Sequence, residues 1–307
     1  MSYILGFGGA TVDLHIRCSK EVVLRDSNPS VMSSSPGGVM RNILDNASRM
    51  GWKCRFLSIV GSDPNGHLLL DRCRSQGIDA SGVLVSDLLP TACYMDFLGP
   101  DGDMVVAAND MAAFDNIPED YLKARAGDIK GAKVLAVDAN PSAERLQQFC
   151  EIASAPIFAD PVSVAKGGKI IPLLGKLFLV KPNLMELELL SGQICRTEDD
   201  IRRAAATVIE KGCHSVAVSL GRDGCYYADA DGESFLERLA PVDNMANATG
   251  AGDAFMAGLI TAYADGLGPR DMVRRALAAG RIAVRSKETI NPEMSMESIE
   301  KELINGY

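Results

Sequence analysis

A glycine-rich segment directly before an apolar helical pattern carries the strongest chemical signal in the sequence. In NATGAGDAFMAGL, residues 247–259, Gly250 and Gly252 precede the predicted helix and Asp253 falls in its first turn. Glycines let backbone N–H groups close around an anion, and the start of a helix adds about half a positive charge. A carboxylate there would repel a phosphate unless it accepts the proton of an attacking hydroxyl group. The segment therefore predicts phosphoryl transfer, with a simple acid at the helix start as the alternative.

Strands and helices that alternate along the chain are expected to position this segment. Short apolar runs that end in glycine or polar residues predict buried parallel strands at 3–9, 133–140, 155–161, 177–183 and 215–221. Helical patterns occur at 41–51, 66–77, 143–154, 184–192, 199–212, 252–266 and 269–286. The alternation predicts an α/β fold, in which an open, mostly parallel sheet carries helices on both faces.

Two segments, 12–35 and 91–109, interrupt this alternation. Apolar and polar residues alternate in both, and the second contains the hairpin signal GPDGD. We expect them to form a small β-sheet inserted into a core made of 1–11, 36–90 and 110–307. Beside the carboxyl edge of the main sheet it would act as a lid, and a decorative pair of hairpins is the alternative.

Composition excludes several classes of partner. The 307 residues carry a formal net charge of −9, which disfavours nucleic acid or an anionic membrane as the main partner. No apolar run approaches the roughly 18 to 20 residues of a membrane span, and the first residues lack the basic region of a signal peptide. The eight cysteines form no CxxC pair, so we expect reduced thiols and a cytoplasmic protein.

A dinucleotide-binding reading of the first strand is disfavoured. The segment GFGGAT lacks the third glycine of G-x-G-x-x-G, because Thr11 stands in its place, and the residues after it alternate like a strand. The sequence also lacks a Walker A motif for ATP.

Residues 249–259, TGAGDAFMAGL, and residues 37–51, GGVMRNILDNASRMG, resemble the two signatures of the ribokinase-like (PfkB) kinase family. The resemblance extends over essentially the whole chain and implies a ribokinase-like fold. It also implies transfer of the γ-phosphate of ATP to a hydroxyl of a sugar or nucleoside, with Asp253 as the general base. The implied anion hole consists of the backbone amides of Gly250, Ala251 and Gly252.

The same resemblance implies where the acceptor binds. Asp13 follows the first strand and would bind two hydroxyls of the sugar. Thr11 replaces the asparagine that precedes this aspartate in the family, which leaves one substrate hydrogen bond open. Gly38 and Asn42 would hold the substrate, although a glycine pair before an asparagine is more often a tight turn.

Two further segments imply where ATP would bind. In VKPNLMELELL, Asn183 and Glu186 match the family motif N-x-x-E, which acts on Mg²⁺ and phosphate largely through water. A solvated helix residue is the alternative for Glu186. The segment SVAVSLGRDGCYY resembles the nucleotide loop of the family, so Ser219, Gly221 and Gly224 would approach ATP.

The resemblance leaves activation by K⁺ open. Many relatives have an aspartate that helps to bind a monovalent cation where this sequence has Asn247. Thr249 is therefore the better candidate for such a cation.

Four segments resemble the branch of the family that phosphorylates the ribose 5'-hydroxyl of pseudouridine: SPGGVMRN, AANDM, ADPVSVAK and INPEMS. In this interpretation Asn109 and Asp110 reach the base and Lys166 contacts phosphate, a surface lysine being the alternative. Ribokinase, fructokinase and other nucleoside kinases remain open, as does a binding protein that has lost turnover. The family also implies a homodimer formed through the β lid.

Overall fold

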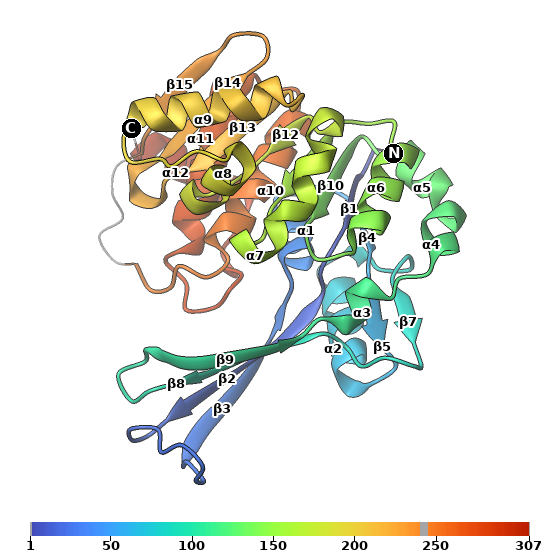
Figure 1. Ribbon diagram of the computed structural model, residues 1–307, viewed down its shortest axis with the longest axis vertical. Helices are drawn as coiled ribbons and strands as arrows, with labels where there is room; N and C mark the ends of the chain where they lie inside the picture. The colour runs from blue at the N-terminus through green and yellow to red at the C-terminus, as the bar shows by residue number, and fades with distance from the viewer. Residues whose placement is uncertain (1, 240–244, 307) are drawn as a thin grey trace.

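A nine-stranded sheet forms the centre of the molecule (Figure 1), as seen in a computed structural model that describes residues 2–239 and 245–306. Its strands lie in the order β15, β14, β13, β12, β11, β10, β1, β4, β6, and only β14 runs antiparallel to its neighbours. The strands are β1 (Ile4–Phe7), β4 (Cys54–Leu57), β6 (Ile78–Asp79), β10 (Val134–Asp138), β11 (Ile157–Asp160), β12 (Leu179–Val180), β13 (Ser215–Ser219), β14 (Cys225–Asp229) and β15 (Ser234–Glu237).

Helices cover both faces of this sheet because its strands are apolar on both sides. In β1, Ile4 packs into one hydrophobic core and Leu5 into another. The first core also contains residues of α1 (Val39–Arg49), α2 (Pro64–Ser75), α10 (Ala251–Ala264), α11 (Pro269–Ala283) and α12 (Met296–Asn305). The second contains residues of α3 (Ala112–Asp115), α4 (Glu119–Ala124), α5 (Ala126–Gly131), α6 (Ala143–Ile152), the 3-10 helix η1 (Gly168–Lys176), α8 (Leu184–Ser191) and α9 (Glu198–Glu210). The open α/β fold predicted from the sequence is confirmed.

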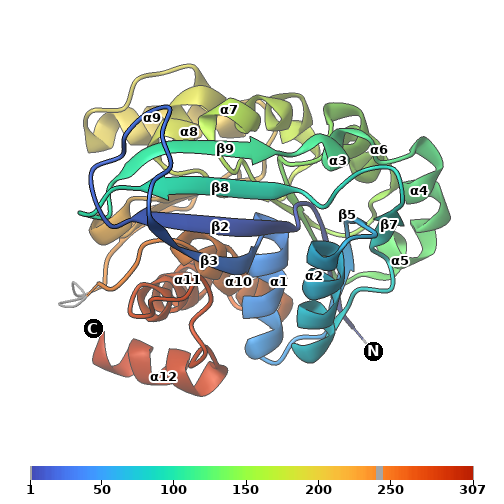
Figure 2. The same cartoon turned by 90° about the horizontal axis from the view of Figure 1, so that it is seen from below.

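A separate four-stranded sheet projects from this core (Figure 1), and we call it the lid sheet. It consists of β2 (Thr11–Cys18), β3 (Ser30–Gly37), β8 (Cys93–Leu98) and β9 (Met104–Asp110). Figure 2 shows the strands in the order β9, β8, β2, β3. The outer pairs are antiparallel hairpins, as predicted, whereas the central strands β2 and β8 run parallel. Two sequence segments about 80 residues apart therefore form one sheet.

The base of the second hairpin is fixed to the core. Asp63, the N-cap of α2, accepts hydrogen bonds from the backbone N–H and the hydroxyl of Thr91, both at 2.7 Å. Nearby, β5 (Ile59–Gly61) and β7 (Leu84–Ser86) form a short parallel pair. The lid sheet is thus hydrogen-bonded to the core just before β8 begins.

Two expectations about cysteines and membranes can be compared with the structure. All eight cysteines are free thiols, and all except Cys93 are buried. Among the residues described, no helix combines the length and apolar character that crossing a membrane requires.

Candidate active site

The candidate site lies along the carboxyl edge of the large sheet, where ligands bind in open α/β folds. Asp138 ends β10, Asp160 ends β11 and Lys181 follows β12 directly. Because these strands are neighbours, charged side chains that are far apart in sequence lie side by side. Each of these three charged residues stands at the end of an apolar strand or directly after it.

Asp253 lies in the first turn of α10, and the glycine before this helix fixes how the helix begins. Gly250 is the N-cap residue and has a left-handed backbone, with φ of 81°. A Cβ atom at Gly250 would overlap the backbone carbonyl oxygen of Thr289. Glycine therefore serves both the backbone angle and the close approach of the 289 segment.

The anion hole that the family resemblance implies would lie at the start of α10. The first amides of a helix have no acceptor within the helix, so they can bind an anion. The amide of Ala251 already donates to the carbonyl of Ala248 at 3.3 Å. A Cβ atom at Gly252 would lie 3.3 Å from Nζ of Lys181, so an ammonium group lies beside these amides. The first amides of α10 and the ammonium group of Lys181 therefore both place positive charge next to Asp253.

The environment of Asp253 suits a general base. Asn42 Nδ2 donates a hydrogen bond of 2.7 Å to Oδ2 of Asp253. Burial and the nearby carboxylate of Asp160 raise the pKa of Asp253 to about 7, although Asn42 and Lys181 act in the opposite direction and Asp138 adds to the rise. A carboxylate with a pKa near neutrality can accept a proton and release it again.

Lys181 is a buried cation that sequence reasoning did not identify. Its Nζ lies 3.2 Å from Oδ2 of Asp160. Burial alone would lower the pKa of Lys181, but Asp160, Glu186 and Asp253 outweigh that effect and raise it. The lysine is therefore protonated at neutral pH and supplies positive charge among three carboxylates. Its position directly after an apolar strand is the sequence signal that could have identified it.

Asn183 and Glu186 hold each other in a capping box at the start of α8. The side chain of Asn183 accepts from the amide of Glu186, and Oε2 of Glu186 accepts from the amide of Asn183, both at 2.9 Å. Glu186 is buried, so the alternative of a solvated helix residue is wrong. Burial and the charge of Asp160 raise the pKa of Glu186. A cation close by would favour its ionised form.

The side chains that could hold a metal ion were also compared with the expected Mg²⁺ site. The described part of the chain contains no group of three or more His, Cys, Asp or Glu side chains that could hold a metal ion. If a hydrated cation binds here, Glu186 would contact it through Oε1, because Oε2 accepts from the amide of Asn183. A single carboxylate such as that of Glu186 fits Mg²⁺, which usually keeps several waters and binds protein through one or two carboxylates.

The three residues expected around ATP lie in one turn next to Asn183. The amide of Ser219 donates to the carbonyl of Pro182 at 2.9 Å, which aligns Ser219 with Asn183. Gly221 and Gly224 have positive φ angles of 60° and 96°. The glycines therefore turn the chain sharply beside the capping box.

At the end of the site where the family resemblance places the acceptor, which we call the acceptor end, Asp13 is held by its neighbours in the lid sheet. The hydroxyl of Thr11 donates to Oδ1 of Asp13 at 2.9 Å. Burial raises the pKa of Asp13, and the Thr11 hydrogen bond opposes that rise. A Cβ atom at Gly37 would overlap the Asp13 carboxylate, so glycine is needed there. Thr11 thus orients Asp13, which explains how threonine can replace an asparagine.

Asp138 joins two parts of the acceptor end, and sequence reasoning missed it. Its Oδ2 accepts hydrogen bonds from the amides of Gly9 and Met40, both at 2.9 Å. Gly38, with φ of 95°, allows the start of α1 to approach this loop, since a Cβ atom there would lie 2.5 Å from the carbonyl oxygen of Gly9. Gly38 therefore permits this close approach of two backbone segments, and it is also a candidate substrate contact.

The register of the lid sheet places the two residues that were predicted to contact the nucleobase, Asn109 and Asp110, on opposite faces. Asp13 pairs with Tyr94, and Tyr94 pairs with Asn109. Directly paired residues point to the same face of a sheet, so Asn109 shares the face of Asp13. Asp110 points to the opposite face and accepts a hydrogen bond from the amide of Ala112 at 3.1 Å. Only Asn109 lies on the side of Asp13.

Lys166 and Thr249 are both hydrogen-bonded to asparagine side chains. Nζ of Lys166 donates to Oδ1 of Asn140 at 2.6 Å, at the end of β10 and two strands from β12. The amide of Thr249 donates to Oδ1 of Asn247 at 2.9 Å, and Nδ2 of Asn247 donates to the carbonyl of Lys287. A carboxylate at 247 could not donate that second bond.

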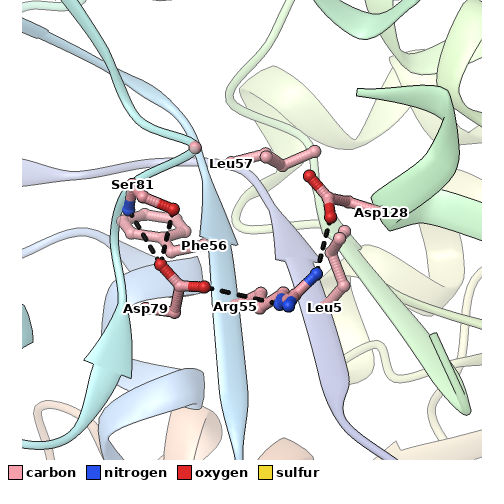
Figure 3. A pocket seen from close by; sticks show the side chains of 8 residues that line it. Leu5, Arg55, Phe56, Leu57, Asp79, Ser81 and Asp128 are labelled. Carbon is pink, nitrogen blue, oxygen red and sulfur yellow. Dashed lines mark hydrogen bonds and ion pairs between the residues drawn. The ribbon is translucent and has the colours of Figure 1, made fainter. Parts of the chain in front are cut away.

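A hollow of about 100 Å³ in another part of the molecule has no part in this site (Figure 3). It lies at β4, where Arg55 pairs with Asp79 at 3.4 Å and with Asp128 at 2.5 Å. None of the candidate site residues lines it. Its single guanidinium group, that of Arg55, is paired with both carboxylates.

A carboxylate with a raised pKa in the first turn of a helix, at the carboxyl edge of an α/β sheet that carries a second, smaller sheet, is the arrangement expected of a small-molecule kinase. Comparison with known proteins agrees, because residues 1–296 match the family described as pfkB family carbohydrate kinase. Pseudouridine kinase of Escherichia coli (strain K12) is 36% identical over 97% of this chain and 95% of its own length. For 2-dehydro-3-deoxygluconokinase of Bacillus subtilis (strain 168), the identity is 27% over 84% of this chain and 83% of its own length.

Solved structures show the same architecture. A ribokinase of Arabidopsis thaliana complexed with ribose and ATP superposes with a TM-score of 0.91 at 21% identity, covering 99% of both chains. A carbohydrate kinase from Agrobacterium tumefaciens gives 0.88 at 26% identity, covering 100% of this chain and 98% of the other. The chain belongs to the pfkB family of carbohydrate kinases, and it is an ATP-dependent kinase.

Proposed function

We propose that this kinase transfers the γ-phosphate of ATP to the ribose 5'-hydroxyl of pseudouridine, with Asp253 as the general base. The observation that carries the proposal is the Asp253 carboxylate, which lies at a helix N-terminus with its pKa raised to about 7. The choice of acceptor rests on the pseudouridine kinase of Escherichia coli, 36% identical over 97% of the chain.

In the proposed reaction, the 5'-hydroxyl oxygen forms a bond to the γ-phosphorus while the bond from phosphorus to the ADP oxygen breaks. The hydroxyl proton passes to Asp253. The amides at the start of α10, from Gly250 to Gly252, and the ammonium of Lys181 would stabilise the charge on the transferring group. The lid sheet would exclude water, which limits hydrolysis of ATP.

The acceptor would bind between the lid sheet and α1. Asp13, held by Thr11, would accept hydrogen bonds from two ribose hydroxyls, and Gly38 and Asn42 would complete the ribose site. Asn109 would reach the base, because it shares the face of Asp13. ATP would occupy the other half, next to Asn183, Ser219, Gly221 and Gly224.

Ions are proposed at two positions. Mg²⁺ would neutralise charge on the ATP phosphates, held by Glu186 through water. A monovalent cation at Thr249 stays a prediction, as does a phosphate contact of Lys166. We expect the reaction to take place in the cytoplasm, where the free cysteines remain reduced.

A sugar kinase is the second candidate, favoured by the 27% identity with the Bacillus subtilis 2-dehydro-3-deoxygluconokinase. An ADP-release assay with ATP and Mg²⁺ separates the candidates. The acceptors are pseudouridine, uridine, adenosine, ribose and fructose, and uridine is the matched control because it differs from pseudouridine only in how the base is attached. We expect a clear preference for pseudouridine. Turnover only with a free sugar would overturn the assignment, and binding without turnover on any acceptor would indicate a non-catalytic relative.

The raised pKa of Asp253 predicts an acid limb in the pH dependence of kcat. The base acts only when deprotonated, so kcat should fall about tenfold for each pH unit below a pKa of about 7. The check is a pH profile at saturating substrates, with ATP affinity measured over the same range to separate the titration of the nucleotide. A profile that stays flat down to pH 5 would indicate an ordinary solvated carboxylate.

We also infer a homodimer formed through the lid sheet. Both edge strands expose apolar side chains: Val31 and Met32 on β3, and Met104, Val105 and Val106 on β9. Such edges are prone to pair with another chain. The Val31→Asp/Val106→Asp variant should sediment as a monomer, whereas Ile304→Asp, at an exposed apolar position on α12, should leave the assembly unchanged. Equal sedimentation of all three proteins would exclude the lid as the interface.

A further inference from the structure

Arg41 is the one charged residue among the largest fully buried side chains of the described core, with 2% of its surface exposed. It lies on α1, and its guanidinium group donates four hydrogen bonds. Nε donates to the carbonyl of Gly37 at 2.9 Å, Nη2 to the carbonyl of Pro36 at 2.8 Å and Nη1 to Oδ2 of Asp45 at 3.1 Å. Nη2 also donates to Oδ1 of Asn42. A buried arginine with this many partners has a fixed position.

The last of these bonds decides how the carboxamide of Asn42 is oriented. The two ends of an amide are similar in shape, so its neighbours determine which end faces which group. Arginine can only donate, and therefore the oxygen of Asn42 must face Arg41. The NH₂ group then faces Asp253, to which it donates at 2.7 Å.

We propose that Arg41 is a positioning residue: it holds Asn42 in the orientation that donates to Asp253, and it links this orientation to the end of lid strand β3. The inference rests on the proposed role of Asp253 as the base. With one carboxylate oxygen, Oδ2, bound by Asn42, the other oxygen is left to accept the proton of the substrate hydroxyl.

The link to the lid sheet follows from the two carbonyl groups that Arg41 binds. Pro36 and Gly37 are the last residues of β3, and they pair with Val12 and Thr11 at the start of β2. A movement of the lid sheet at this end displaces acceptors of Arg41. The arrangement therefore couples the position of the lid to the hydrogen bond on the base.

Loss of Arg41 has a predictable effect on the charge state of the base. The charged groups around Asp253 are Asp160, Asp138 and Lys181, and Arg41 acts on it both directly through its charge and through Asn42. The hydrogen bond from Asn42 lowers the pKa of Asp253. When Arg41 is absent, the amide is free to rotate and that bond weakens. The pKa of Asp253 should then rise further.

The test compares Arg41→Met with Arg49→Met. Arg49 lies on the same helix and binds the other oxygen of Asp45, with Nε 2.7 Å from Oδ1, but it does not contact Asn42. We expect Arg41→Met to lower kcat at pH 7 by about 10- to 100-fold and to move the acid limb upward by about one pH unit. Added guanidinium ion should restore part of the activity. Arg49→Met should keep the acid limb of the unmodified protein.

A second measurement separates positioning from folding and from the base role itself. Carbon-13 NMR of labelled aspartates, assigned with Asp253→Asn, gives the pKa of Asp253 without any turnover. Arg41→Lys keeps the charge beside Asp45 but lacks the fork that reaches both Pro36 and Asn42, so it should raise this pKa in a folded protein. Equal pKa values and acid limbs in the Arg41 and Arg49 variants would overturn the positioning role. Full turnover of Asp253→Asn would instead overturn the base role.

Discussion

Replacement of Asp253 by asparagine is expected to lower kcat by roughly 10²- to 10⁴-fold, which is the usual contribution of a general base. Asparagine has nearly the shape of aspartate but cannot take the proton of the attacking hydroxyl. Binding of ATP and of the nucleoside should persist, because the amides of α10 and the lid sheet are unchanged. Single-turnover kinetics together with calorimetric titration of both ligands measures the two effects separately.

Protein stability provides the control for this substitution. The pKa of Asp253 is raised from 3.8 to about 7 in the folded protein, so the folded state binds more protons than the unfolded state between these values. Ionisation of Asp253 therefore lowers the free energy of unfolding as the pH rises through this window. Asp253→Asn removes that charge, and its Tm at pH 8 should equal or exceed that of the unmodified protein. Asp271→Asn, at an exposed position of α11, should change neither Tm nor kcat, and a turnover above a tenth of normal for Asp253→Asn would contradict the mechanism.

Replacement of Lys181 by methionine should have the second-largest effect. Removing this cation leaves the buried carboxylates of Asp160 and Glu186 and the half-buried carboxylate of Asp253 without their shared partner. We expect kcat/KM for ATP to fall by about 10²-fold or more and Tm to fall as well, since breaking a buried ion pair leaves an uncompensated charge. The acid limb should move to higher pH, because Lys181 lowers the pKa of Asp253. Steady-state kinetics across pH and calorimetry would measure all three changes.

A double variant distinguishes the two roles of Lys181. Lys181→Met/Asp160→Asn removes both partners of the ion pair, so it should recover stability without recovering turnover. The single variant Asp160→Asn is the reference for any contribution of that carboxylate. If the double variant regained full turnover, Lys181 would be only a counter-ion for Asp160.

Much of the fold follows from local sequence patterns. The strands of the sheet that carry the site are short apolar runs, and the helices between them have a clear apolar period, so their types could be predicted. The two lid hairpins were also predictable from their alternation and from GPDGD. Their association was not, because the parallel pairing of β2 with β8 joins segments that carry no local signal for each other. Strand β4 and helix α12 were missed, although α12 carries the local signals of a Ser295 N-cap and an acidic first turn.

The candidate site, too, could be predicted only in part from the sequence. Asp253 and its glycines stand in one continuous segment, so the candidate anion-binding helix start could be predicted from spacing and helix physics. The catalytic environment could not, because the pKa of Asp253 depends on Asp160, Asp138 and Lys181 at the ends of three different strands. The separation of Asn109 from Asp110 depends on sheet register, which becomes clear only when β8 and β9 are paired. Arg41 looked like an ordinary helix residue until its four acceptors were seen.

The hydrogen bonds of Asp138 also constrain when the acceptor end can be completed during synthesis of the chain. The carboxylate binds amides that lie 129 and 98 residues earlier in the sequence, at Gly9 and Met40. The signature helix α1 and the first lid hairpin leave the ribosome long before their shared acceptor exists. Until β10 has emerged and paired with β1, these amides can bind only water or non-native partners. The part of the chain that we propose to bind the acceptor is thus made first and completed late.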